Sequence, residues 1–188
     1  MPNVIIIKPA QYQRMPWKNG LGETLEIQKM EDDQGLRFRI SQASVKADGV
    51  FSNFAGLHRT LVLLSGNGMT LAHSGKHTSV LNNPLDIARF SGGDETHATL
   101  HNGTIEDLNI MVRNSDTHAK VEAYTAPCSF SFSNNDTLFS GFYASEDSVI
   151  EMENAEAVTI KAHSMVTFSQ NAKATLTQGR GVLVCISG

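Results

Sequence analysis

The chain has 188 residues, of which 40% are hydrophobic and 18% are charged, and its formal net charge at pH 7 is -4. This composition is typical of a globular protein with enough apolar side chains for a core. The sequence contains no run of lysines and arginines, which argues against nucleic acid as a partner. Its longest apolar runs, such as residues 4–7 and 61–64, are too short to span a bilayer, so no membrane partner is expected.

Cysteine content and the first residues bear on the cellular compartment. Cys128 and Cys185 are too few for a disulfide framework. The first residues lack a basic segment followed by a long apolar one, which is the pattern of a secretory signal. Both features predict a protein of the reducing cytoplasm, with a single disulfide bond as the alternative.

Short strands are the predicted elements along the whole chain. Apolar, β-branched runs predict strands buried on both faces, and strict alternation of apolar and polar residues predicts half-buried strands. In chain order the segments are 4–7 (apolar), 36–41 (alternating), 61–64 and 108–112 (apolar), 158–161 (alternating) and 182–186 (apolar). Turn sequences such as Asp48-Gly49 and Asn102-Gly103 separate them, and no stretch has a convincing helical period. The fold class is therefore all-β, as a sandwich or a barrel.

A faint internal repeat suggests two copies of one β unit. Two segments contain the same residue types in the same order. The run 108–112 is preceded by Phe90-Ser91, Ala98-Thr99-Leu100 and Gly103, and the run 182–186 is preceded by Phe168-Ser169, Ala174-Thr175-Leu176 and Gly179. The alternative is chance similarity between short hairpins. We predict one compact chain, 1–188, with an N-terminal β module over about 1–113, which holds the candidate pocket, and a C-terminal β module over 114–188. Each module has the size of a small jelly-roll barrel.

The first candidate site segment, residues 15–27, contains the only tryptophan of the chain. Trp17 offers an apolar wall, Lys18 a cation, Asn19 an amide and Gly20 an accessible backbone N–H, and Thr24 adds a hydroxyl. These groups suit a small anionic or amide-bearing ligand. The alternative is an ordinary turn in which Trp17 fills the core and Lys18 is solvated.

The second candidate segment, residues 51–59, feeds a predicted buried strand. Phe51 and Ser52 supply an aromatic and a hydroxyl group, and Arg59 can bind a carboxylate with two parallel hydrogen bonds. Arg39 and Ser41 lie two residues apart, on one face of a predicted strand, where both can point into a barrel mouth.

The third candidate segment opens the strongest apolar strand. Asp107 and Asn109 share one face of this strand, where they line a pocket or, equally, brace loops. Metal binding is not expected, because the seven histidines include no His-x-His pair. The spacing of four residues in the pairs His73/His77 and His97/His101 corresponds to about 13 Å on a strand, too far for one ion.

Three sequence blocks occur in a fixed order within residues 4–113. They are Pro16-Trp17-Lys18-Asn19-Gly20-x-Gly22-x-Thr24-x-Glu26-Ile27, then Phe38-Arg39-Ile40-Ser41-x-Ala43-x-Val45 with Gly49-x-Phe51-Ser52-x-Phe54-x-Gly56-x-x-Arg59 and Leu63-Leu64-x-Gly66-x-Gly68, and Asp107-Leu108-Asn109-Ile110-Met111-x-Arg113. This order resembles the HutD/Ves family. The resemblance implies a cupin-like double barrel (a bicupin of jelly-roll type) and a small-molecule binding protein without an established enzyme activity. Leu21 and His58 depart from the usual family pattern.

The resemblance also suggests a role. HutD members are associated with histidine utilisation, which implies a regulator that senses a breakdown intermediate such as formylglutamate, whereas Ves members are associated with stress response. Our leading hypothesis is a protein without metal or other cofactor that binds a small carboxylate-bearing metabolite. The alternatives are a metal-free isomerase or hydrolase that uses Glu26, His97 and Asp107, and an interaction module that forms a homodimer through exposed β edges.

Overall fold

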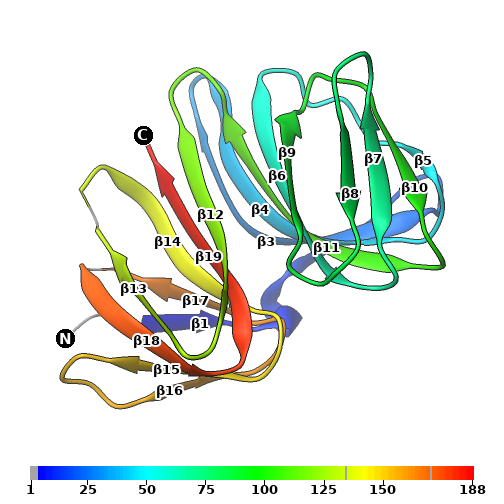
Figure 1. The fold of residues 1–188 in the computed structure, drawn as a ribbon. Coiled ribbons are helices and arrows are strands. Elements are labelled where there is room, and N and C mark those ends of the chain that lie inside the picture. The colour runs from blue at the N-terminus through cyan, green and yellow to red at the C-terminus, as the bar shows by residue number, and fades with distance from the viewer. Residues whose placement is uncertain (1–3, 134, 170) are drawn as a thin grey trace. The chain divides into compact units, whose positions relative to one another are not determined.

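The computed structural model describes residues 4–133, 135–169 and 171–188. It divides into two compact units, and we call Gln13–Thr117 the central unit. The second, which we call the terminal unit, combines the segment that ends at Tyr12 with His118–Gly188 (Figure 1). All regular elements of the described residues are strands except one short 3-10 helix, η1 (Pro9–Gln11), so the predicted all-β class is confirmed. No helix within these residues is both long and apolar enough to pass through a membrane.

The central unit consists of two antiparallel sheets. The six-stranded sheet has the order β2 (Gln13–Pro16), β3 (Gly22–Asp32), β4 (Gly35–Val45), β11 (Ile105–Arg113), β6 (Leu57–Ser65) and β9 (Ile87–Ser91). The four-stranded sheet has the order β5 (Gly49–Val50), β10 (Thr96–Leu100), β7 (Met69–His73) and β8 (Thr78–Leu81). Apolar side chains such as Leu61, Leu71 and Ile105 form its core.

The terminal unit repeats this architecture. Its five-stranded sheet has the order β1 (Val4–Ile7), β17 (Met165–Phe168), β14 (Thr137–Ala144), β19 (Arg180–Ser187) and β12 (His118–Thr125). Its four-stranded sheet has the order β13 (Cys128–Phe132), β18 (Ala172–Gln178), β15 (Ser148–Met152) and β16 (Val158–Ile160). The orders β4-β11-β6-β9 and β5-β10-β7-β8 recur as β12-β19-β14-β17 and β13-β18-β15-β16. This correspondence agrees with the repeat in the sequence.

The strand at residues 4–7 corrects two expectations. Leu61 and Leu108 belong to runs that are buried on both faces as predicted, but β1 is an edge strand on which Ile5 is 60% exposed. Its partner is β17, with Val4 opposite Phe168. The apolar run is therefore the fifth strand of the terminal sheet, and the compact units differ from the predicted modules 1–113 and 114–188 at this point.

Candidate functional site

A cavity of about 490 Å³ opens in the central unit. The predicted site residues that line it are Trp17, Lys18, Asn19, Thr24, Arg39, Ser41, Phe51, Ser52, Arg59, Asp107 and Asn109. Gly20 is the one predicted residue that does not line it. Segments far apart in the sequence are thus brought to one concave surface, although their binding of a ligand stays a prediction.

Strand pairing explains this convergence. Met111 of β11 lies opposite Arg39 of β4 on one side and Arg59 of β6 on the other. Two residues along β11, Asn109 lies opposite Ser41. Asp107 lies another two residues along the same strand. Because alternate side chains of a strand share one face, the pairing places these polar groups together on the inner face of the sheet.

Arg59 is the most deeply placed cation of the cavity, with only 5% of its surface exposed. Its Nη2 donates a hydrogen bond to Asn109 Oδ1 at 2.9 Å. Its guanidinium carbon also lies 5.2, 5.3 and 5.0 Å from the ring centroids of Phe51, Phe54 and Phe90. Arg59 Nε has no hydrogen-bond partner among the described residues. The rings fix the side chain while part of its hydrogen-bonding capacity stays unused.

Asn109 links Arg59 to a buried carboxyl group. Its Nδ2 donates a hydrogen bond to Asp107 Oδ1, and both residues are almost fully buried. Burial raises the pKa of Asp107 to about 7, against the opposing effects of the Arg59 charge and the Asn109 hydrogen bond. Burial likewise lowers the pKa of Arg59 to about 10, where it remains a cation at neutral pH. The cavity therefore contains a fixed positive charge next to a carboxyl group that titrates near neutrality.

A second arginine has a partner of its own. Arg39 Nε lies 2.9 Å from Glu26 Oε2, and both side chains are largely buried. Glu26 is not among the residues that line the cavity, so Arg39 lines the cavity while its ion-pair partner does not. This ion pair neutralises much of the Arg39 charge, whereas Arg59 is hydrogen-bonded to the neutral amide of Asn109 and makes no direct carboxylate contact among the described residues.

The turn between β2 and β3 forms one wall of the cavity. Trp17 Nε1 donates a hydrogen bond to Thr24 Oγ1 at 2.9 Å, and the indole also packs against the apolar core. Trp17 is thus both a core residue and a cavity wall, and Lys18 is exposed at the rim. A Cβ at Gly22 would lie 2.9 Å from the indole ring, so this position requires glycine. Gly20 serves the turn itself, with a φ of +72°.

The loop before β6 contributes further aromatic side chains to the cavity lining. The Phe51 N–H donates to Thr96 O at 2.9 Å, and the Phe54 N–H donates to Gly92 O at 2.8 Å. Phe54 and Met111 line the cavity although they were not selected from the sequence. Phe54 shares the second candidate segment with Arg59, and Met111 shares the strand face of Asn109. Period-two alternation was the signal that would have found Met111.

The histidines correct one geometric argument. The rings of His73 and His77 lie only 4.4 Å apart, because a tight turn, not a continuous strand, joins them. Even so, no group of three or more His, Cys, Asp or Glu side chains placed to hold a metal occurs in the described part of the chain. His97 is exposed on β10 and does not line the cavity, so Asp107 is the one member of the proposed acid–base set that does.

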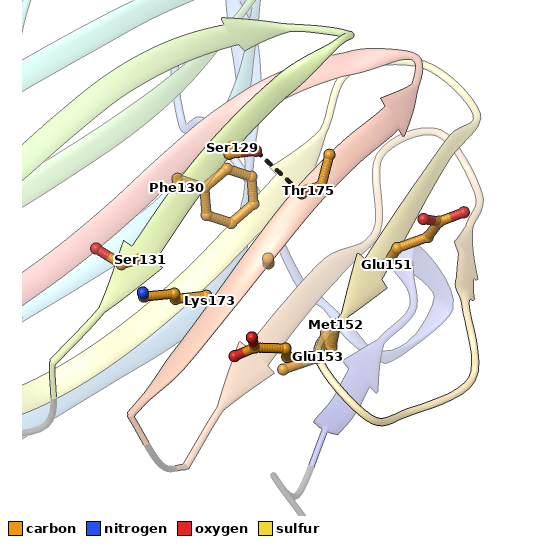
Figure 2. Close-up of a pocket in the computed structure, with 9 residues that line it drawn as sticks. Ser129, Phe130, Ser131, Glu151, Met152, Glu153, Lys173 and Thr175 are labelled. Carbon is orange, nitrogen blue, oxygen red and sulfur yellow. Dashed lines mark hydrogen bonds between the residues drawn. The ribbon is translucent and has the colours of Figure 1, made fainter.

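The terminal unit offers a different concave surface. A groove of about 550 Å³ is lined by residues of β13, β15 and β18 and by Glu153, which follows β15. Figure 2 shows Ser129 and Thr175 of neighbouring strands, which are joined by a 3.0 Å hydrogen bond. The charged residues of its lining, Glu151, Glu153 and Lys173, are all exposed. This groove therefore lacks a buried charge comparable to Arg59.

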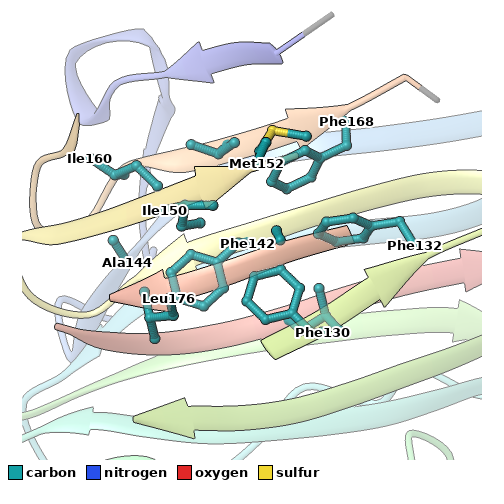
Figure 3. Close-up of a cluster of buried hydrophobic side chains, with 12 residues drawn as sticks. Phe130, Phe132, Phe142, Ala144, Ile150, Met152, Ile160, Phe168 and Leu176 are labelled. Atoms are coloured by element: carbon teal, nitrogen blue, oxygen red, sulfur yellow. The ribbon is translucent and has the colours of Figure 1, made fainter. Parts of the chain in front are cut away.

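Aromatic side chains fill the interior of the terminal unit. Figure 3 shows Phe130, Phe132, Phe142 and Phe168 among the buried residues of this cluster. Phe130 and Phe142 stack with their ring centroids 5.8 Å apart, and Phe132 stacks on Phe168 at 4.0 Å. The candidate ligand site of the chain is therefore the cavity of the central unit.

Comparisons with known proteins agree with the fold and the motif order. The HutD family profile matches residues 9–185. An uncharacterised 21.2 kDa protein in the hutC 3′ region of Pseudomonas putida is 36% identical over 113 residues, and protein Ves of Citrobacter koseri is 36% identical over 114 residues. Each alignment spans only 59% of the length of the relative, and 59% and 58% of this chain.

Solved structures extend the similarity to nearly the whole chain. HutD from Pseudomonas fluorescens SBW25, in a structure described as a formate condition, is 25% identical with a TM-score of 0.84 over 98% of both chains. A cupin 2 conserved barrel domain protein from Leptotrichia buccalis, 9% identical, has a TM-score of 0.55 over 88% of both chains, which shows the cupin-like character of the fold. The family profile, the motif blocks and these structures lead to one conclusion: this chain belongs to the HutD family.

Proposed function

We propose that the central unit binds a small carboxylate-bearing metabolite in its cavity. The observation that carries the proposal is Arg59, a buried guanidinium with an unused Nε donor in a cavity of about 490 Å³. Burial of a charge is costly unless the charge is paired, and Asn109 is a neutral partner. A carboxylate is the ligand group that matches the charge and the planar fork of a guanidinium.

The remaining lining suits a small polar molecule with an apolar part. Lys18 at the rim adds a second positive charge for an entering anion. Trp17 and Phe51 supply flat apolar walls. Asn19, Thr24, Ser41 and Ser52 supply hydrogen-bonding groups. The volume lies within the range of about 300–1,000 Å³ that is usual for small-molecule pockets.

We infer a regulatory role in the cytoplasm for this binding, with a histidine-degradation intermediate such as formylglutamate as the ligand. The HutD membership supports this assignment, and the formate condition named for the Pseudomonas fluorescens structure is compatible with carboxylate binding. We further propose that the two units are the two jelly-roll barrels of a bicupin. Their shared strand order supports this description.

Calorimetric titration tests the proposal with formylglutamate, glutamate, urocanate and formate. We expect at least one of these carboxylates to bind the wild-type chain. The substitution Arg59→Met should weaken that binding about 10- to 100-fold, because a hydrogen bond to a charged group contributes about 1.5–3 kcal/mol. Lys18→Ala should weaken it only about two- to fivefold, since an exposed charge is screened.

Lys173→Ala is the matched control, because this lysine lies in the groove of the terminal unit. It should leave the affinity unchanged. No heat with any of the four carboxylates, or equal binding by the wild type and Arg59→Met, would contradict the proposal.

Asp107 supports a second candidate function, a metal-free isomerase or hydrolase. A carboxyl group with a pKa of about 7 is matched to general acid–base catalysis at neutral pH. Incubation of the protein with the same metabolites, followed by mass spectrometry, separates the two functions. Unchanged metabolites that nevertheless bind would establish binding without turnover.

A further inference from the structure

Asp107 is a carboxyl group inside a cavity that we propose to hold an anion. Only 1% of its surface is exposed. Within the described residues its side chain makes no ion pair, and its hydrogen-bond partner is the neutral amide of Asn109. The buried carboxylate and the cation Arg59 are thus separated by an amide instead of paired directly.

A ligand carboxylate at Arg59 would lie close to Asp107. The amide of Asn109 bridges the two groups, because its Oδ1 accepts a hydrogen bond from Arg59 Nη2 at 2.9 Å and its Nδ2 donates one to Asp107 Oδ1, so a single amide group separates the guanidinium from the carboxyl group. Two negative charges at such a separation repel each other strongly when water is excluded from between them. Binding of an anion therefore favours the neutral form of the carboxyl group.

We propose that Asp107 takes up a proton from solvent when an anion binds beside Arg59, so that ligand binding is coupled to proton uptake. This inference rests on the proposed function of the cavity. The proton adds to Asp107 Oδ2 and no other bond changes. Oδ1 continues to accept the hydrogen bond from Asn109, so the contact of Asn109 with Arg59 is retained. Affinity for the anion then increases as the pH falls.

The groups around Asp107 are compatible with this role. The pKa of Asp107 near 7 places its proton exchange at neutral pH. Arg59 stays protonated in this range, and burial lowers the pKa of His73, whose ring lies 4.5 Å from that of Phe90, which favours the neutral form of this histidine. The other charged groups facing the cavity or flanking Asp107 are Lys18 of the β2–β3 turn, Arg39 of β4 with its partner Glu26 of β3, and Glu106 of β11, which accepts a hydrogen bond from Gln42.

Titration calorimetry with formylglutamate at pH 6, 7 and 8 tests the coupling. Each titration is run in two buffers of different ionisation enthalpy, which reveals the number of protons taken up. We expect up to one proton at pH 8, and a loss of affinity of up to about tenfold between pH 6 and pH 8. The carboxylates of the ligand remain ionised over this range, so they do not contribute.

Two variants assign the proton to its site. Asp107→Asn is neutral and keeps an oxygen that accepts from Asn109, so it should bind at pH 8 as tightly as the wild type does at pH 6, without proton uptake. Glu106→Gln is the matched control, since it removes the neighbouring carboxylate, which bonds to Gln42. It should retain the proton uptake, with the pH dependence moved to slightly lower pH, because the Glu106 charge contributes to the raised pKa of Asp107.

The outcomes separate this inference from the proposed function. Binding without proton uptake, or Asp107→Asn that is folded and binds more weakly than the wild type at every pH, would overturn the coupling and leave carboxylate binding intact. If Asp107→Asn does not fold, the number of protons that the wild type takes up on binding decides whether the coupling exists. No binding of formylglutamate, glutamate, urocanate or formate at pH 6 would overturn both.

Discussion

The two units share a strand order but differ in what fills them. In the central unit, Arg59 lies opposite Met111 and Leu61 lies opposite Asn109. In the terminal unit, Ser140 lies opposite Cys185 and Phe142 lies opposite Leu183. When the runs 108–112 and 182–186 are aligned, Leu183 takes the place of Asn109 and Gly181 that of Asp107. Ser140, which pairs with Cys185, then takes the place of Arg59, which pairs with Met111.

This comparison shows how one strand order accommodates two different interiors. Polar and charged residues occupy three inner positions of the central unit, where they line the cavity. Phenylalanine rings occupy the corresponding interior of the terminal unit, which gains stability from apolar burial. The shared strand order therefore does not by itself specify the proposed binding function, which depends on the side chains at these positions.

The largest expected effect is loss of a central ring of the terminal unit. Phe142 is fully buried, and Phe142→Ala should lower the free energy of unfolding by about 3–5 kcal/mol. Urea denaturation measures the change. Under conditions in which Phe142→Ala is folded, its ligand affinity should equal that of the wild type. A loss of affinity together with the loss of stability would show that the two units are not functionally separate.

The next effect concerns pH and the central unit. The pKa of Asp107 in the folded chain, about 7, lies above its ordinary value of 3.8. The stabilising contribution of this group is therefore complete below about pH 4 and is lost as the pH rises through 7. Relative to Asp107→Asn, the wild type should lose at most about 1.4 kcal/mol of stability per pH unit between pH 5 and 7. The free energies of unfolding of both proteins are measured by denaturation at each pH. If the two values change equally between pH 5 and 7, the shifted pKa of Asp107 is contradicted.

A third test addresses the close approach of backbone and indole in the β2–β3 turn. A Cβ at Gly22 would lie 2.3 Å from Ser44 O and 2.9 Å from the Trp17 ring. We expect Gly22→Ala to destabilise the chain by about 1–3 kcal/mol, as overpacking does, and to weaken ligand binding as the indole moves. Gly49→Ala is the control, because nothing lies within 4 Å of a Cβ at that glycine. Equal stability of the two variants would count against the close packing.

The smallest effect is loss of a single hydrogen bond in the cavity wall. Trp17→Phe keeps an aromatic wall but removes the bond to Thr24. Stability should fall by about 0.5–1.5 kcal/mol, and affinity by a few-fold. Trp17→Ala, which also removes the wall, should have a larger effect on both measurements.

Period-two alternation and turn residues were sufficient to predict the all-β class and the shared face of Asp107 and Asn109. They could not show that Asn109 lies between Asp107 and Arg59, because the pairing of β11 with β6 fixes that contact across fifty positions of the chain. The turn that joins His73 to His77 was missed because a four-residue spacing was measured along a straight strand. Whether a strand lies at the edge of a sheet likewise depends on its pairing. The apolar run of β1 therefore predicted an interior strand.

The pairing of β1 with β17 has a consequence for how the protein is made. The central unit is one continuous stretch of chain, so it can fold as soon as that stretch has left the ribosome. β1 is synthesised before the central unit but finds its partner only when β17, after the central unit, has emerged. Until then the apolar side chains of Val4 and Ile6, which pack against the core of the terminal unit, stay uncovered. We expect nascent chains halted before β17 to be the species that chaperones retain.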